Sequence, residues 1–437
     1  MRVHPIFLVL SCLLAFAVAG CNTGKGVNSG STHGTMRVIN VIPNAGGALN
    51  VTFDNQPFAT GLAFEGMTAY QPIDSGTREV QIAVAGSSTN VVDLIPTFLA
   101  DNSYTFVAFG AVGTATGTVV NDTLTVDPGA GMFALRVING ASNNAGIDVY
   151  VTSPGEDLNT VSPSIAGVGY ATTSVFVNLP AGSRQIRVTA ANSKQVIYDA
   201  PAQVFAERAQ VEAIVYSRGS SALVNVAFLN IDDTGTGSIG NSQLARFKVI
   251  NGSMAGSPLN VFVDQNLALS NIPYAAASSY QTINAGSRVL TIESAATPGA
   301  ALLTLPVTFP SATDTAIAIT GPAGALSATL YSEPNFPAAL DRARVRFVNI
   351  TADVAALDVF VNFSRQVTGL PMNTVSPGIE VAADPTAGTS YEFDFNVSGS
   401  SQPALQLPGV ILLGGQLYTI YVVGPGSALA GVVVQDN

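Results

Sequence analysis

Histidine is almost absent from this chain of 437 residues. The two histidines, His4 and His33, both lie within the first 35 residues. The rest of the chain therefore has no histidine to serve as the base of a Ser-His-Asp or Cys-His arrangement. Zinc and non-haem iron sites built on imidazole ligands are excluded there for the same reason.

Cysteine is equally scarce, because the chain has two, Cys12 and Cys21. Cys12 lies in a segment typical of a cleaved leader, so we expect one cysteine in the mature chain and no internal disulfide bond. A single thiol cannot assemble an iron–sulfur cluster or a thiolate zinc site. Stability must come from apolar cores, for which 47% hydrophobic residues are sufficient.

Positive charge is also in short supply. The chain has 17 basic residues against 28 acidic ones, a net charge of −11, and three lysines: Lys25, Lys194 and Lys248. Nucleic acids, phosphate groups and anionic lipid surfaces attract basic patches. We therefore expect no nucleic-acid partner.

Residues 1–20 are typical of a bacterial secretory leader. A short basic start, MRVHP, precedes the apolar run IFLVLSCLLAFA, which is shorter than the about 20 residues of a transmembrane helix. The following VAGC resembles a bacterial lipobox, which implies that Cys21 becomes the N-terminus and carries lipid. The alternative is an ordinary signal peptide cleaved nearby, which leaves Cys21 as a free thiol.

The residues after the cysteine predict a tether and a location. Residues 21–35, CNTGKGVNSGSTHGT, bury too little apolar surface to fold, so we expect a flexible tether. Asn22, rather than Asp, follows Cys21. The resemblance to lipoproteins then implies a cell-envelope protein of the outer membrane, facing either the outside or the periplasm.

One short motif occurs four times along the chain. The segments MRVIN, LRVIN, FKVIN and VRFVN each end on an asparagine: Asn40, Asn139, Asn251 and Asn349. The spacings of 99, 112 and 98 residues are those of β-sandwich modules rather than of solenoid repeats. Because the motif holds almost nothing able to do chemistry, we interpret the repetition as encoding a fold.

A second pattern of two aromatic residues and a glycine, six residues apart, recurs in the first three repeats. Its members are Phe64, Tyr70 and Gly76; Tyr170, Phe176 and Gly182; and Tyr274, Tyr280 and Gly286. The fourth repeat departs from this spacing, because extra residues precede Gly388.

The runs between turn residues are short and rich in Val, Ile, Phe and Tyr, and no window has a helical period. We predict an all-β chain of four tandem β-sandwich modules, each of roughly seven strands in two sheets. The modules span residues 36–125, 135–231, 244–332 and 342–437. Glycine-rich linkers near Val126 and from Asp232 should be flexible, and the proline-containing linker from Glu333 stiffer.

The repeats resemble the bacterial family of domains of unknown function 4397. The resemblance rests on the basic–aliphatic strand with its asparagine, on the following DVYV or NVFV, and on the segment IPYAAASSYQTINAGSRVLTI from Ile272. It covers nearly everything after the tether and is weakest late in the fourth repeat. It implies immunoglobulin-like β-sandwiches on secreted or envelope proteins, and it implies no catalytic residues.

Three further patterns offer little chemistry. GTGSIG, residues 235–240, matches a dinucleotide-binding pattern, but no helix is expected to begin there. Asp232 and Asp233 could bind calcium in a linker, although a solvated loop is the alternative. Paired carboxylates could hydrolyse glycosides, and the candidates are Glu65, Asp74, Glu79, Asp148, Glu156, Asp157, Glu207, Glu212, Asp358 and Glu392. Since Asn50 and Asn260 replace Asp148 and Asp358 in other repeats, we expect hydrogen bonding at strand ends there rather than catalysis.

The sequence therefore favours a lipid-anchored envelope protein that binds or adheres through tandem β-sandwich modules. We expect no enzymatic activity, no cofactor and no metal site, and a partner that is a protein or a polysaccharide. The alternative is a structural spacer or subunit of an envelope assembly. A glycan-active enzyme that uses carboxylates alone is the remaining hypothesis.

Overall fold

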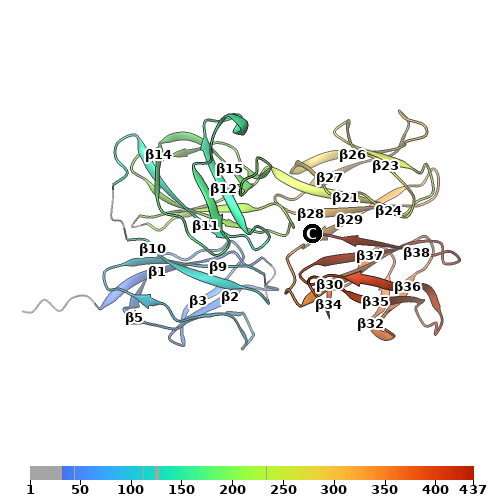
Figure 1. Cartoon of the computed structure of the whole chain (residues 1–437), viewed down its shortest axis with the longest axis horizontal. Coiled ribbons are helices and arrows are strands. Elements are labelled where there is room, and N and C mark those ends of the chain that lie inside the picture. The colour runs from blue at the N-terminus through green and yellow to red at the C-terminus, as the bar shows by residue number, and fades with distance from the viewer. Residues whose placement is uncertain (1–31, 44, 112, 124–126, 233) are drawn as a thin grey trace, which may run out of the picture.

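The structure, a computed structural model, describes residues 32–43, 45–111, 113–123, 127–232 and 234–437 (Figure 1). The described residues are all-β, as predicted, and form nine sheets. The helical element of the described residues is a single 3₁₀ turn, η1 (Leu158–Thr160). Within this part of the chain, no helix has the length and apolarity needed to cross a membrane.

Sheet pair 1 consists of two four-stranded sheets around one core. Its first sheet contains, in order, β10 (Thr116–Asn121), β9 (Ser103–Phe109), β1 (His33–Asn40) and β4 (Gln71–Asp74). Its second sheet contains β3 (Gln56–Leu62), β2 (Leu49–Phe53), β6 (Val80–Val84) and β7 (Asn90–Leu94). The short strands β5 (Gly76–Thr77) and β8 (Thr97–Phe98) form a separate ladder.

Sheet pair 2 has the same plan with additional strands. The first sheet contains β14 (Val177–Pro180), β11 (Met132–Gly140), β18 (Gln210–Tyr216), β19 (Asn225–Asn230) and β20 (Gly237–Gly240). The second contains β13 (Ile165–Gly169), β12 (Gly146–Thr152), β15 (Gly182–Ala190) and β16 (Val196–Asp199), with β17 (Gln203–Phe205) also beside β15.

Sheet pair 3 repeats the plan again. Its first sheet contains β24 (Ala276–Ala277), β21 (Leu244–Asn251), β28 (Asp314–Thr320) and β29 (Ser327–Glu333), with β25 (Gln281–Asn284) also beside β21. Its second sheet contains β23 (Asn266–Ile272), β22 (Leu259–Val263), β26 (Gly286–Ser294) and β27 (Ala301–Phe309).

Sheet pair 4 closes the chain. Its first sheet contains β33 (Thr374–Val375), β30 (Arg342–Thr351), β37 (Leu417–Gly424) and β38 (Ala430–Gln435), with β34 (Ile379–Ala382) also beside β30. Its second sheet contains β32 (Ser364–Pro371), β31 (Ala356–Val361), β35 (Thr389–Val397) and β36 (Pro403–Leu412).

The repeated motif forms an interior strand of the first sheet in every pair. The motif strands β1, β11, β21 and β30 each run parallel to a later strand of the same sheet: β9, β18, β28 and β37. Alternate side chains of β1 face opposite sides of its sheet. Met36 and Val38 enter the core of sheet pair 1, whereas Ile39 packs against sheet pair 2. Burial on both faces explains why the motif is apolar apart from its base and its asparagine.

Adjacent sheet pairs share apolar cores, so they are held together by packing as well as by the segments that link them. Ile39 and Phe109 of sheet pair 1 cluster with Ile138 and Tyr216 of sheet pair 2. A corresponding cluster joins sheet pairs 3 and 4. Figure 1 shows the resulting two-by-two block, with the C-terminus near its centre. Each first sheet therefore contributes to two apolar cores at once.

Two of the expected linkers also contain ordered, packed structure. Within the glycine-rich segment after Asp232, residues 237–240 form β20, which pairs with β19. A Cβ atom at Gly237 would lie 2.5 Å from Leu229, so the missing side chain permits this close approach. In the proline-containing linker, Asn335 and Phe336 are buried rather than spacing two modules apart.

The two ends of the chain were the subject of separate predictions. Cys21 and most of the predicted tether lie outside the described residues, and β1 already begins at His33. At the other end, the uncharged run 407–434 was expected to form strands with turns rather than a membrane helix. It contains the end of β36, all of β37 and most of β38, which confirms that expectation.

Candidate functional site

The repeated asparagine joins the two sheets of each pair. Asn251 donates from Nδ2 to the carbonyl of Ile272 at the end of β23, at 3.0 Å, while its Oδ1 accepts from the backbone of Ser253 at 3.0 Å. The corresponding bonds recur in the other three repeats, and all four asparagines are buried. The repetition therefore encodes a fold, as the sequence indicated.

The basic residue of the motif has an unexpected position. Three residues before each asparagine stand Arg37, Arg136, Lys248 and Arg346, on the strand face that packs against the neighbouring sheet pair. Sequence reasoning missed this role. The available signal was a base at one fixed position of an otherwise apolar strand, in a chain with few bases.

Between sheet pairs 1 and 2, two of these bases meet two acids. Arg37 lies 3.3 Å from Glu212, and Arg136 donates from Nε to the other oxygen of Glu212 at 2.7 Å. Asp122 binds Arg136 and lies 3.7 Å from Arg37. Burial, followed by the nearby charge of Asp122, raises the pKa of Glu212 to about 7. The cluster is electrically balanced, with two formal charges of each sign.

A corresponding cluster lies between sheet pairs 3 and 4. Lys248 lies 3.1 Å from Glu333 and also binds Asp436, while Arg346 donates to Glu333 at 2.7 Å. Asp436 additionally accepts from the Thr419 hydroxyl at 2.6 Å. Paired charges with further hydrogen bonds are the form in which ions are tolerated in protein interiors.

Sheet pair 2 contacts both later sheet pairs through the loop between β18 and β19. The Ser220 hydroxyl donates to Asp314 of sheet pair 3 at 2.7 Å, and the Ser221 hydroxyl donates to the Asp436 carbonyl near the C-terminus at 2.8 Å. The backbone of Asn335 donates to the Gly219 carbonyl at 2.8 Å. These bonds connect the two halves of the block.

The second repeated pattern surrounds the same bases. Tyr70 and Phe176 lie over the guanidinium groups of Arg37 and Arg136, each at 4.7 Å from the ring centroid, and Tyr280 lies 4.9 Å from the Lys248 ammonium. These distances are within the range of cation–π contacts. The repeated glycines Gly76, Gly182 and Gly286 have φ of +104°, +98° and +97°, which side chains rarely adopt.

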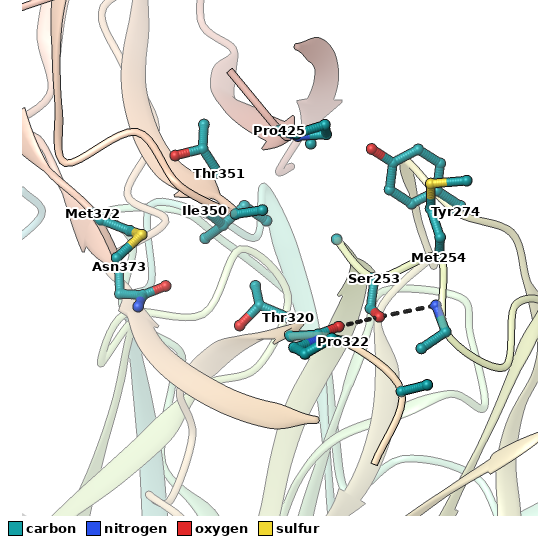
Figure 2. A pocket seen from close by; sticks show the side chains of 16 residues that line it. Ser253, Met254, Tyr274, Thr320, Pro322, Ile350, Thr351, Met372, Asn373 and Pro425 are labelled. Atoms are coloured by element: carbon teal, nitrogen blue, oxygen red, sulfur yellow. Dashed lines mark hydrogen bonds between the residues drawn. The ribbon is translucent and has the colours of Figure 1, made fainter. Parts of the chain in front are cut away.

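A groove opens between sheet pairs 3 and 4, where the two motif strands end (Figure 2). It encloses about 700 Å³. Figure 2 shows Met254 and Tyr274 on one side, Met372 and Asn373 on the other, and Ile350 between them. No charged side chain is among the lining residues, which are drawn from the described part of the chain. The groove therefore suits a neutral, largely apolar ligand.

Comparison with the first half of the chain explains why the groove is open. In each repeat, the asparagine pairs with a residue of the neighbouring parallel strand, β9, β18, β28 or β37. The residue directly after that partner is Phe109, Tyr216, Thr320 or Val423, respectively. Between sheet pairs 1 and 2, the ring of Phe109 packs against that of Tyr170, with the ring centroids 5.8 Å apart. The ring of Tyr216 packs against that of Phe64, with the centroids 6.0 Å apart. Thr320 and Val423 are too small to fill the corresponding space, and the groove remains.

Few polar groups in the groove are available to a ligand. The Ser253 hydroxyl donates to the Gly321 carbonyl at 2.6 Å, and the Thr351 hydroxyl donates to Asn349 at 2.8 Å. Within the described residues, the Tyr274 hydroxyl and the Asn373 side-chain amide have no hydrogen-bond partner. These two groups can fix the orientation of a bound molecule.

The candidate carboxylates occupy structural positions. Asp148 and Asp358 accept from the backbone of Gly167 and Gly369, each at 2.7 Å, and Asn50 and Asn260 accept equivalent bonds. This confirms the prediction of strand-end hydrogen bonding. Five other candidates also have partners within the protein. Asp74 pairs with His33, and Glu79, Glu156, Asp157 and Glu207 accept hydrogen bonds from Asn55, Ser153, Asn159 and Gly131, respectively.

Two candidate acids are bound by bases at the interface of sheet pairs 1 and 2. Glu65 reaches Arg218 at 2.6 Å, and Glu212 is held by Arg37 and Arg136. Glu212 has Asp122 as an acidic neighbour, but their side chains are both 0% exposed and offer a substrate no access. The Glu392 backbone pairs with Asn362. Glu212 and Asp122 therefore stabilise the interface between sheet pairs 1 and 2.

The remaining sequence candidates have simple placements. Asp232 accepts from Thr234 and Gly235 in a tight turn, and Asp233 lies outside the described residues. Among the described side chains, no group of three or more His, Cys, Asp or Glu is arranged to hold a metal ion. The calcium hypothesis stays a prediction. In GTGSIG, strand β20 occupies the position where a nucleotide-binding helix would begin.

One family of domains matches this chain twice. The match is to "Domain of unknown function (DUF4397)", over residues 34–150 and 245–360. Each matched segment covers one sheet pair and continues through the first two strands of the next, β11 and β12 or β30 and β31. No curated protein is similar to the chain at a significant level.

Solved structures offer distant similarities. A "putative cell adhesion protein" from Bacteroides uniformis ATCC 8492 is 10% identical, with a TM-score of 0.22, covering 47% of this chain and 98% of that one. The Bacillus anthracis TIE protein is 7% identical, with a TM-score of 0.15, covering 90% of this chain and 69% of that one. At these TM-scores, neither protein informs the function of this chain.

Proposed function

The chain belongs to the DUF4397 family, and on that premise we propose that it is a lipid-anchored protein of the bacterial cell envelope that binds a protein ligand. In this proposal the four sheet pairs are four immunoglobulin-like β-sandwich modules, and Cys21 carries the lipid that anchors them to the outer membrane. The modules act as a rigid block that presents the groove between sheet pairs 3 and 4.

The groove is the observation that carries this proposal. Its lining is uncharged and includes Tyr274, Met254 and Met372, which suits apolar side chains of a protein segment. A polysaccharide needs many hydrogen-bond partners, whereas most hydroxyls of the groove are already bonded within the protein. A protein ligand is therefore favoured over a neutral polysaccharide.

The position of the groove supports display away from the membrane. In Figure 1, β1 begins at the left end of the molecule, whereas β24 and β38 are at the right end. Tyr274 and Pro425, which line the groove, precede these two strands in the chain. An anchor at Cys21 would hold the left end, and the groove would face away from it. Loops at the end of a rigid β-scaffold are common binding surfaces.

The proposal is tested by closing the groove with residues that the first half of the chain already uses. The purified chain from residue 32 and its Thr320→Tyr/Val423→Phe double variant are exposed to a phage-displayed library of random peptides. We expect neutral, apolar peptides to be enriched on the unaltered chain and not on the double variant. Equal enrichment on both would contradict binding in the groove.

A second arm addresses orientation at the cell surface. Proteinase K is added to intact cells that produce the full chain, and the released peptides are identified by mass spectrometry. Release of peptides from residues 132–437 is expected for a surface-exposed protein. Protection until the outer membrane is opened would place the groove in the periplasm and direct the search to envelope partners.

A structural spacer is the second candidate function. The observation that favours it is the pair of shared apolar cores, which make the block stiff without any need for a ligand. A spacer predicts that the groove-filling double variant functions in cells as well as the unaltered protein. Under the binding proposal, the same variant loses function while the block remains folded.

A further inference from the structure

We propose that sheet pair 4 carries a second binding site, above Arg346, for a tyrosine side chain of a partner polypeptide. The site is separate from the groove and stands independently of it. It is identified by comparing the four repeats, because the fourth lacks an aromatic ring that the other three supply themselves.

The missing ring is located by a hydrogen bond present in all four repeats. In each motif strand, the residue directly after the base donates its backbone N–H to a nearby hydroxyl, that of Thr68, Ser174, Ser278 or Ser376. Two residues later, the chain has Tyr70, Phe176, Tyr280 and Gly378, respectively. Gly378 therefore occupies the place of the ring that covers the motif base elsewhere.

The space left by the missing ring is a hollow of about 500 Å³. Its walls include Arg346, Asp436, Asn335, Phe336 and Pro377. Arg346 lines this hollow and its side chain is 12% exposed, whereas the guanidinium groups of Arg37 and Arg136 are covered by rings at 4.7 Å. A planar ring from outside can occupy this space and stack on the guanidinium.

The polar groups of the hollow match those around Tyr70. In sheet pair 1, Arg37 donates from Nε to Thr105 at 2.7 Å, Thr105 donates to Asp122, and the Tyr70 hydroxyl donates to Asp122 at 2.7 Å. This arrangement holds the phenol ring by its face and by its hydroxyl group.

In sheet pair 4 the same relay is present without the phenol. Arg346 donates from Nε to Thr419 at 2.7 Å, and Thr419 donates to Asp436 at 2.6 Å. Asp436 is among the residues that line the hollow. Its side chain is 1% exposed, close to the 0% of Asp122, which Tyr70 covers, and in the proposed complex it accepts a further hydrogen bond from the phenol hydroxyl, as Asp122 does.

Whether the ring is a tyrosine or a phenylalanine depends on one further residue of the repeat, at or directly after the end of β10, β19, β29 or β38. That position, marked by backbone pairing with Ser103, Gln210, Asp314 and Leu417, holds Asp122, Ile231, Glu333 and Asp436. Where the acid is present, the ring is a tyrosine whose hydroxyl donates to it, as Tyr70 and Tyr280 do. Where Ile231 replaces the acid, the ring is Phe176. Because sheet pair 4 has the acid, its absent ring should be a phenol.

The surroundings favour a polypeptide as the source of the phenol. The hollow lies beside Gly378, directly before β34, and β34 is an outer strand of its sheet that pairs with β30 alone among the described strands. The free edge of an outer strand can pair with an extended segment from another chain. A segment paired there would place one side chain beside the hollow.

Isothermal titration calorimetry with small probes tests the chemistry of the site. The purified chain from residue 32 is titrated with N-acetyl-tyrosinamide, N-acetyl-phenylalaninamide, p-cresol and an acetylated Val-Tyr-Val amide. We expect the tyrosine amide to bind about tenfold more tightly than the phenylalanine amide, because its hydroxyl bonds a carboxylate. The tripeptide should bind more tightly than p-cresol. Equal affinity for the tyrosine and phenylalanine amides would contradict the recognition of a phenol hydroxyl. Equal affinity for p-cresol and the tripeptide would contradict a polypeptide as the ligand.

Variants at Gly378 locate the site. Gly378→Tyr supplies the ring from within the chain and should abolish binding of the tyrosine amide. Gly378→Ala is the matched control, because its added Cβ meets flexible carbons of the Arg344 side chain, at 3.0 Å, and leaves the hollow open. Retained binding by Gly378→Tyr would overturn the assignment. In the Asp436→Asn variant, the tyrosine amide and the phenylalanine amide should bind with about the same affinity.

The outcome is distinguishable from that of the groove experiment. The Thr320→Tyr/Val423→Phe double variant should bind the tyrosine amide with unchanged affinity, because its substitutions lie outside the hollow. Loss of tyrosine binding in that variant would assign the ligand to the groove and overturn the site above Arg346.

Discussion

Arg37 and Arg136, which occupy the same position in two repeats 99 residues apart, bind the two oxygens of one carboxylate. The distances to Glu212 are 3.3 Å and 2.7 Å, and the acid is fully buried between sheet pairs 1 and 2. The equivalent bases Lys248 and Arg346 share Glu333 in the second half. The repeat therefore encodes an interface between sheet pairs as well as the sheet pairs themselves.

The first prediction concerns the buried bases. Replacing Arg37 with Met leaves Asp122 and Glu212 short of one counter-charge, so the free energy of unfolding should fall by about 3–5 kcal/mol. Chemical denaturation measures the change. Arg365→Ala is the control, because that side chain is 55% exposed and lies 3.8 Å from Asp358, and it should cost less than about 1 kcal/mol. Similar losses for both variants would contradict the role of the cluster.

The second prediction concerns pH. Burial and the charge of Asp122 raise the pKa of Glu212 to about 7, against an ordinary value of 4.5. Between these values the folded chain holds a proton that the unfolded chain has released, so stability falls as pH rises from about 4.5 to 7. Each unit of pKa corresponds to about 1.4 kcal/mol.

Thermal unfolding at pH 5 and pH 8 measures this effect. The unaltered chain should have its higher Tm at pH 5, and Glu212→Gln, which cannot titrate, should reduce the difference. A Tm that rises between pH 5 and pH 8, or an unchanged difference in the variant, would refute the assignment to Glu212.

The third prediction concerns the repeated asparagine. Asn251→Ala removes the bonds to Ile272 and Ser253 and leaves buried backbone groups without partners. Each such group costs about 1–3 kcal/mol, so the variant should lose several kcal/mol of stability, as measured by urea unfolding. Asn266→Ala is the control, because its amide makes one exposed bond to Asp264. A loss in the control equal to that of Asn251→Ala would argue against the inter-sheet role.

The fourth prediction concerns anchoring. If Cys21 carries the proposed lipid, Cys21→Ala should release the chain from membranes, and fractionation with immunoblotting measures the distribution. Cys12→Ala removes the other cysteine, which lies in the predicted leader, and should leave the membrane fraction unchanged. Membrane retention of the Cys21 variant would exclude the lipid anchor.

Sequence patterns predicted the strands and the repeat well, because both depend on neighbours along the chain. Alternation and turn residues decide which segments become strands, and the spacing of Asn40, Asn139, Asn251 and Asn349 indicated the repeating unit. The positive φ of Gly76 and its equivalents likewise explains a glycine that recurs at one position. The glycines of segment 237–240 indicated a linker, but the segment forms a strand that packs closely on Leu229.

The buried charge cluster, the groove and the hollow could not be predicted from the sequence. Glu212 was one acid among ten candidates, and nothing local indicated that Arg37, 175 residues earlier, would bind it. The groove and the hollow are spaces left by small residues, Thr320 and Gly378, where other repeats have rings. Such spaces become visible only when the four repeats are compared in three dimensions.

The sequence by itself determined an all-β chain and a unit repeated four times, since side-chain alternation and turn geometry are set over a few residues. Only the tertiary structure decided which sheets pack face to face and which base meets which acid. Those contacts depend on the complementarity of surfaces contributed by residues far apart in the chain, as Ile39 and Ile138 show in one shared core.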